Sequence, residues 1–189
     1  MALDYRTLAE RYRPRRIRVL FIAESPPAAS SRGKEAYFFL EDSPGSEVFL
    51  ATLVEALYDE KYRQAPGRKV QFLRRFQDDG YYWLLDAVES PINRVGGRPV
   101  PEAQRAQLIR DAIPSLIDRL EGFRDLGVLR PETGLILIKK LVFETLAVPL
   151  VEAGFTVLND AKIDFPKYQG DRDTIRGVQR ALVRLAATP

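Results

Sequence analysis

The fold is decided by RVLFIAESPP, residues 18–27, where an apolar run ends abruptly at a polar turn. Val19–Ile22 predict a buried parallel strand, because a strand covered on both faces shows a continuous apolar run instead of alternation. Glu24 and Ser25 fall just past the carboxyl end of this strand, where open α/β sheets bind their ligands. The two prolines that follow fix φ and stiffen the turn. We therefore expect a pocket at this turn; the alternative is a strand that leaves the sheet without binding anything.

Outward from this stretch, strand and helix signals alternate along the chain. Strands that alternate with helices imply a parallel sheet with right-handed crossovers and helices on both faces. We predict a single domain over residues 1–189 with an α/β fold, a three-layer α/β/α sandwich around a central four-stranded parallel sheet. Gly96 and Gly97 mark a flexible loop. Strands are expected over residues 17–23, 81–88, 135–138 and 155–158, and helices over 4–12, 46–58, 69–77, 101–120, 141–152 and 171–185.

The composition excludes several kinds of chemistry, because the 189 residues include no histidine and no cysteine. A Ser-His-Asp or Cys-His nucleophile is impossible, as are Cys/His zinc sites and iron–sulfur clusters. Any metal would be a hard cation held by carboxylates and carbonyls, and we expect neither a metal nor a cofactor. No apolar run approaches the roughly 20 residues that span a bilayer, and the N-terminus lacks a signal-peptide core. We expect a cytoplasmic, monomeric protein with no membrane partner, which the absence of cysteine also fits.

Arginine is unevenly distributed, although the net charge is only +3 and the sequence pI is about 9.2. Patches of arginine neutralise the phosphates of nucleic acids, so DNA or a nucleotide is the expected partner. The alternative is a solvated helix face that nearby acids balance. One set of arginines precedes the first strand: Arg11, Arg13, Arg15, Arg16 and Arg18. The other set recurs every four residues along the last helix: Arg172, Arg176, Arg180 and Arg184.

The common nucleotide-binding motifs are missing. The chain has neither a G-x-x-x-x-G-K-[ST] phosphate loop nor a G-x-G-x-x-G fingerprint, which disfavours P-loop enzymes and dinucleotide dehydrogenases. Residues 23–27 superficially echo the G-x-S-x-G serine elbow, but both glycines are absent and no histidine can serve as the base.

A series of short motifs nevertheless follows the predicted strands in order. They are AESPP at 23–27, YFF at 37–39, DAVESPINR at 86–94, LILIKK at 135–140 and FPK at 165–167. In this order they resemble the motifs of the uracil-DNA glycosylase superfamily, in which G-E-A-P-G or G-Q-D-P-Y ends the first strand and H-P-S follows the fourth. The resemblance covers most of the chain and implies a uracil-DNA glycosylase-like fold. It also implies recognition of a damaged or deaminated base in DNA, with metal-independent hydrolysis of the N-glycosidic bond.

The resemblance implies a role for each motif residue, because the target base would leave the stack and enter the crevice. Glu24 and Ser25 would orient or deprotonate the attacking water as the catalytic pair. Phe38 or Tyr37 would stack on the base, and Asp86 or Asn93 would read its edge. The DNA itself would be contacted by Lys139, Lys140, Phe165, Lys167 and Arg172.

Departures from the family pattern leave the chemistry open. Ser25 stands where the family often has aspartate or asparagine, and a neutral hydroxyl is a weak base. Phe165 stands where several families have a histidine that stabilises the departing base. A non-catalytic protein that binds nucleic acid or a nucleotide on the same scaffold is therefore the alternative. A more distant one is a carboxylate–metal hydrolase that uses Glu24, Asp86 and Asp164.

Each of these residues also has a structural explanation. For Phe38 it is a place in the core, because aromatic side chains are usually buried. For Asp86 it is a hydrogen bond to a loop, and for Asn93 a role in a turn. For Lys139 and Lys140 it is ordinary surface charge at a strand end.

Overall fold

The computed structural model describes residues 4–28, 37–41, 47–62, 65 and 67–186. Its centre is a four-stranded parallel sheet in the order β2-β1-β5-β6. The strands are β1 (Val19–Ala23), β2 (Tyr82–Asp86), β5 (Gly134–Leu137) and β6 (Thr156–Val157). The predicted set of four parallel strands is thus confirmed; β1, β2 and β6 are shorter than expected, and β5 has the predicted length but begins one residue earlier.

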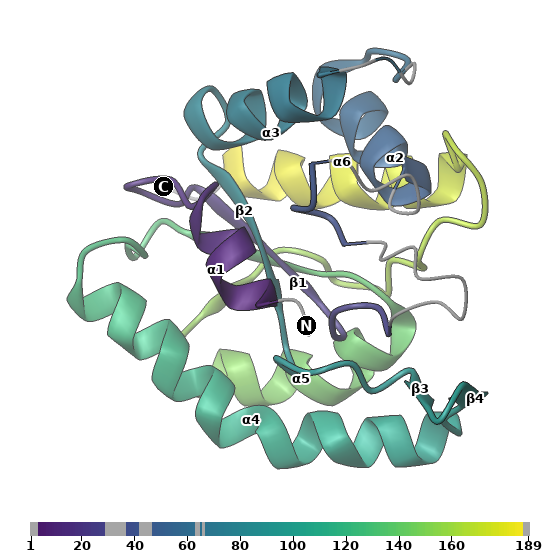
Figure 1. Cartoon of the computed structure of the whole chain (residues 1–189). Coiled ribbons are helices and arrows are strands. Elements are labelled where there is room, and N and C mark those ends of the chain that lie inside the picture. The colour runs from purple at the N-terminus through teal and green to yellow at the C-terminus, as the bar shows by residue number, and fades with distance from the viewer. Residues whose placement is uncertain (1–3, 29–36, 42–46, 63–64, 66, 187–189) are drawn as a thin grey trace.

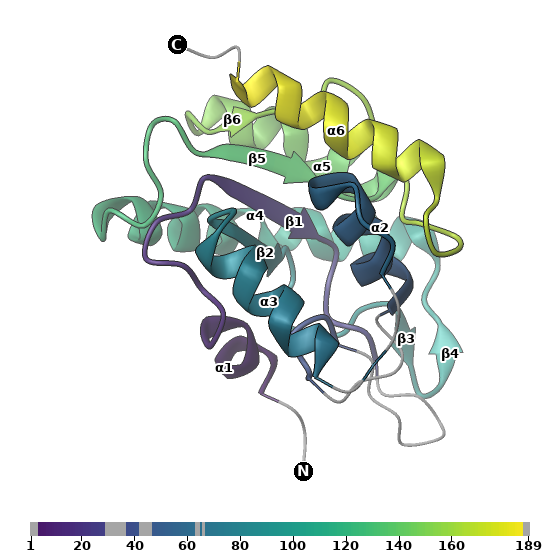
Figure 2. The same cartoon turned by 90° about the horizontal axis from the view of Figure 1, so that it is seen from above.

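Helices cover both faces of the sheet, as Figures 1 and 2 show. On one face lie α2 (Glu47–Tyr58), α3 (Arg68–Asp78) and α6 (Arg172–Ala186), and on the other lie α4 (Glu102–Asp125) and α5 (Lys140–Glu152). The short α1 (Tyr5–Glu10) is joined to β2, because Trp83 Nε1 donates a hydrogen bond to the Ala9 carbonyl at 3.1 Å. Residue 46, the expected start of α2, lies outside the described residues.

The apolar run of β1 forms the middle of the core. Val19, Leu20, Phe21 and Ile22 are each 0% exposed, as a strand with neighbours on both sides and helices on both faces requires. The central position of β1 brings its polar carboxyl end between the ends of β2 and β5.

The longest helix extends beyond its predicted end. The helix expected to end at residue 120 continues to Asp125, and it is visibly bent (Figure 1). Pro114 lies inside this helix, and an internal proline removes one backbone hydrogen bond and bends the axis. None of the helices in the described ranges is both long and apolar enough to cross a membrane.

The flexible loop expected at Gly96 and Gly97 is instead the turn of a hairpin. Strands β3 (Arg94–Val95) and β4 (Arg98–Pro99) pair in antiparallel register on either side of the two glycines. Gly96 and Gly97 have φ values of 56° and 79°, and a two-residue turn of this kind needs positive φ at both positions. The glycines therefore close a defined turn, and the prediction of a flexible loop was wrong.

Candidate functional site

A cavity of about 260 Å³ opens at the carboxyl ends of β1 and β2. Strand pairing places Ala23, the last residue of β1, directly beside Asp86, the last residue of β2. The walls are completed by the turn after β1, residues 37 and 38, α2, the segments after β2 and β5, and the loop before α6. Of the eleven site residues that the sequence predicts, eight line this cavity: Glu24, Ser25, Tyr37, Phe38, Asp86, Asn93, Lys139 and Phe165.

Glu24 is the most buried charged group of the cavity, at 1% exposure. Arg105 Nη1 donates to its Oε1 at 2.6 Å, and Lys139 Nζ donates to its Oε2 at 2.6 Å. Such pairing is required, because a buried charge without a partner is strongly destabilising. A carboxylate has about four acceptor positions, so each oxygen of Glu24 keeps one for a ligand or a water.

Lys139 is placed by an unusual backbone conformation. Its φ is +82°, outside the regions that non-glycine residues normally adopt. Its N–H donates to the Ile163 carbonyl at 2.8 Å, and the chain then turns directly into α5. This conformation brings the Lys139 ammonium to Glu24 and over the Phe165 ring, 5.3 Å from its centroid. Strained conformations of this kind concentrate at functional sites.

Asp86 is buried in the same cavity as Glu24 and Lys139, and the pKa of its carboxyl group lies near neutral pH. Burial raises the pKa of its carboxyl group to about 7, and the negative charge of Glu24 acts in the same direction. The positive charge of Arg119 opposes this rise in pKa. A hydrogen bond from the Tyr37 hydroxyl and the positive charge of Lys139 also oppose it. The pKa of Tyr37 is itself raised, mainly by burial, so its hydroxyl stays protonated and donates to Asp86.

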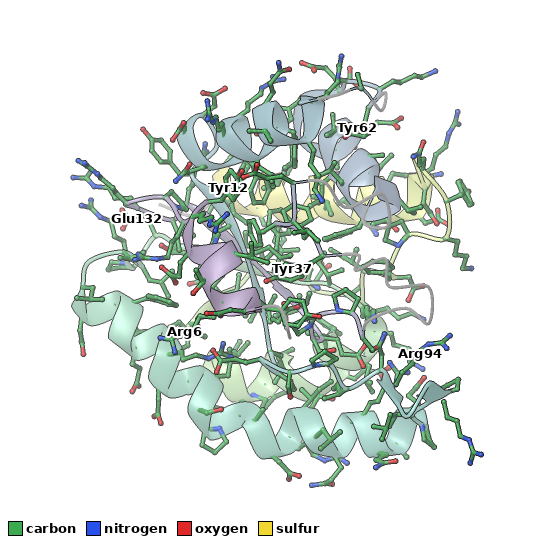
Figure 3. The ribbon with its side chains drawn as sticks, in the orientation of Figure 1. Arg6, Tyr12, Tyr37, Tyr62, Arg94 and Glu132 are labelled. Atoms are coloured by element: carbon green, nitrogen blue, oxygen red, sulfur yellow. The ribbon has the colours of Figure 1, made fainter. Side chains whose placement is uncertain are left out.

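The aromatic side chains of the cavity differ in how far they are exposed. Phe38 is only 5% exposed and packs edge-on against Phe39, with ring centroids 5.0 Å apart. Phe165 is 42% exposed and stacks on Phe49 at 5.1 Å. The Phe165–Phe49 pair, from a loop and from α2, is therefore the aromatic surface nearest to solvent. Tyr37 lies deeper, edge-on to Tyr5 of α1 at 4.8 Å, and Figure 3 shows it beside that helix.

Ser25 and Asn93 fasten the turn that follows β1. Ser25 Oγ donates to the Pro26 carbonyl at 3.2 Å and accepts from the Ile92 N–H at 3.4 Å. Asn93 Oδ1 accepts from the Ala28 N–H at 3.1 Å. Both side chains join residues 25–28 to the segment after β2 and so fix the shape of the cavity mouth.

Three predicted DNA-contacting residues lie outside the cavity. Lys140 is half exposed and pairs with Glu144 at 3.8 Å, one turn along α5. Lys167 and Arg172 are exposed, in the loop after Phe165 and at the start of α6. Within the described ranges no group of three or more acidic side chains could hold a metal ion, and Asp164 does not line the cavity. The trio required by a carboxylate–metal hydrolase is therefore not brought together.

Arg105 and Phe49 are the site residues that sequence reasoning missed. Arg105 is 81 residues from Glu24, in the first turns of α4, and Phe49 sits in a helix with an ordinary apolar stripe. Only the demand of a buried carboxylate for cations could have pointed to an arginine, without saying which one. In comparisons with family models, curated proteins and solved structures, nothing matches this chain.

Proposed function

We propose that this protein is a uracil-DNA glycosylase-like protein that takes a damaged or deaminated base from DNA into the cavity and hydrolyses its N-glycosidic bond. The observation that carries the proposal is the ion pair of Glu24 with Lys139 in an aromatic-walled cavity at the strand ends that the buried Asp86 also lines. Its volume of about 260 Å³ lies just below the range of drug-sized sites, which suits a single base. The motif order and the helices on both faces of the sheet support the same superfamily.

In the proposed reaction, a water oxygen attacks C1′ of the sugar while the C1′–N bond breaks. The base leaves with the electron pair of that bond, and the water gives up a proton. Asp86 accepts this proton, because a carboxyl group with a pKa of about 7 is matched to proton transfer at neutral pH. Glu24 orients the water through its free acceptor positions, and the Lys139 ammonium stabilises the negative charge on the departing base.

Binding without cleavage is the second candidate, and one observation favours it. The hydroxyl of Ser25 and the amide oxygen of Asn93 are already engaged by the backbone, and both oxygens of Glu24 already bind cations. Polar groups with partners can shape a cavity without activating a water. A base would then be held by the Phe165–Phe49 pair and by Lys139 alone.

A glycosylase assay with EDTA present separates the two candidates. Single- and double-stranded oligonucleotides carrying uracil, hypoxanthine, xanthine or a G·T mismatch are incubated with the protein, and alkali-labile abasic sites are counted. We expect Asp86→Asn to lower kcat/KM by about 100-fold or more and to abolish an acid limb near pH 7. Glu24→Gln is expected to lower it as well, whereas Glu152→Gln, an exposed acid at the end of α5, should not.

The melting temperature of each variant is measured alongside, so that loss of activity is assigned only to folded protein. If the wild-type chain cleaves none of these substrates but binds one of them, the second candidate holds. Full activity in folded Asp86→Asn would remove Asp86 from the reaction.

A further inference from the structure

A basic hollow lies at the end of the sheet opposite the cavity, where the parallel strands begin. Its volume is about 600 Å³. Its charged and aromatic lining residues are Arg15, Arg16, Arg18, Tyr81, Arg130 and Glu132. They come from the segments before β1, β2 and β5, and the Arg18 N–H donates to the Tyr81 carbonyl at 2.8 Å. Figure 3 labels Glu132 at this end and Arg94, in β3 beyond the cavity, at the other.

The hollow carries positive charge that nearby acids do not balance. Arg15, Arg16 and Arg18 are exposed, and none of them forms an ion pair with another residue in the described part of the chain. Arg130 faces Glu132 at 3.9 Å, a long contact between two exposed side chains that contributes little. Guanidinium groups match the geometry of phosphate oxygens, so a row of unpaired arginines favours a ligand with several phosphates.

Tyr81 adds an aromatic ring to this basic surface. Its side chain is 50% exposed, and its φ of +50° is an outlier for a bulky residue. Because half of the side chain is exposed, burial of the ring does not compensate for the cost of this backbone conformation. An exposed aromatic ring among arginines is the arrangement by which proteins bind single-stranded nucleic acids, with bases stacked on the ring and phosphates held by the cations.

We propose that this hollow binds a single-stranded nucleic acid segment, with Arg15, Arg16, Arg18 and Arg130 on the phosphates and Tyr81 stacked on a base. The surface is separate from the cavity, so it is a second nucleic-acid contact that does not depend on the proposed glycosylase reaction. Unpaired strand that extends beyond a bound lesion, or a free single strand, would be its ligand.

Fluorescence anisotropy with labelled oligo(dT), which contains none of the target bases, tests the proposal on the full chain. We expect Arg16→Glu/Arg18→Glu to lower affinity at least tenfold and to reduce the slope of log K against log salt by about 1.4, which corresponds to two phosphate contacts. Tyr81→Ala should lower affinity about tenfold with the slope unchanged, because stacking involves no counterion release. The matched control is Arg68→Glu/Arg74→Glu, the same charge change at exposed positions of α3, which should retain wild-type affinity.

Three results would overturn the proposal. One is unchanged affinity in Arg16→Glu/Arg18→Glu. Another is an equal loss in the α3 control, which would show non-specific attraction. The third is an unaltered affinity in Tyr81→Ala together with equal binding of inorganic polyphosphate, which would identify a polyanion site without base stacking. Asp86→Asn should bind oligo(dT) normally, so failure of the cavity reaction and failure of this surface are distinguishable.

Discussion

Asp86 is the residue on which the proposed reaction depends. It ends β2 beside Glu24, and it also lines a second cavity of about 250 Å³ between α1 and α4. Asp86 is nevertheless only 9% exposed, and this burial is the main cause of its raised pKa. The cavity therefore gains one negative charge as the pH passes through about 7.

This titration has a consequence for folding stability. The unfolded chain releases the Asp86 proton near pH 3.9, whereas the folded chain keeps it until about pH 7. Between these values the folded state binds more protons, so the free energy of unfolding should fall as the pH rises, by a total on the order of 4 kcal/mol. Urea unfolding of wild type and Asp86→Asn from pH 4 to pH 8 measures this fall.

The asparagine variant should lack the part of the pH dependence that belongs to Asp86. Glu152→Gln removes an exposed carboxylate instead and should follow the wild-type curve. If Asp86→Asn loses stability between pH 4 and pH 7 as steeply as wild type, the proton is not held at Asp86.

Sequence alone could predict the acids of the cavity but not their partners. Glu24 and Asp86 each follow or end a strand, so their meeting at one edge of the sheet is a consequence of parallel pairing. Arg105 approaches from a helix whose position depends on the packing of α4 against α5. No spacing in the sequence encodes that approach. The contact of Lys139 with Glu24 depends on a backbone conformation that lysine rarely adopts.

Among the elements, β5 and the segment after β6 fit together only because Gly134 has no side chain. A Cβ atom at this position would overlap the Leu158 side chain, and Leu158 N–H donates to the Leu135 carbonyl at 2.8 Å. We expect Gly134→Ala to lower the free energy of unfolding by about 1–3 kcal/mol, because the buried Leu158 side chain must shift to make room for the added methyl. Chemical denaturation of the two proteins measures the difference.

Gly122 of α4 provides the matched control. A Cβ atom there would meet no atom within 4 Å, and alanine is preferred over glycine in a helix. The same Gly→Ala change should therefore stabilise the protein at Gly122 and destabilise it at Gly134. Destabilisation of similar size at both positions would contradict the fit between Gly134 and Leu158.

Local sequence predicts the strands whose residues are all buried, but it does not predict an element boundary that depends on tertiary contacts. The continuous apolar runs of β1 and β5 predict buried strands, which the structure confirms. The end of α4 was predicted too early, because Phe123 in its last turns packs edge-on against Trp83 at 5.4 Å. That contact joins residues 40 apart in the sequence and is invisible to helix propensity.

On the scale of the whole molecule, the arginines of the first-strand approach and of the last helix lie on different surfaces. Arg15, Arg16 and Arg18 surround the basic hollow at the amino ends of the strands. Arg172, Arg176, Arg180 and Arg184 are all exposed along α6, as their spacing predicts. The chain between Phe165 at the cavity and Arg172 is short, so the start of α6 belongs to the cavity end. A duplex whose flipped base occupies the cavity would therefore meet Lys167 and Arg172, and it would not reach the basic hollow.

Charge reversal at each of the two surfaces should therefore weaken the binding of a different nucleic acid. For a duplex carrying the target base, Lys167→Glu/Arg172→Glu should reduce the slope of log K against log salt by about 1.8, since each phosphate contact on B-DNA contributes about 0.9. Arg16→Glu/Arg18→Glu should leave duplex binding unchanged and weaken oligo(dT) binding. Lys167→Glu/Arg172→Glu should weaken duplex binding and leave oligo(dT) binding unchanged. Anisotropy titrations of both ligands at several salt concentrations give the four slopes. Equal losses for both ligands in both variants would mean that the two surfaces act as one diffuse positive field, because only long-range attraction ignores where the charge is placed.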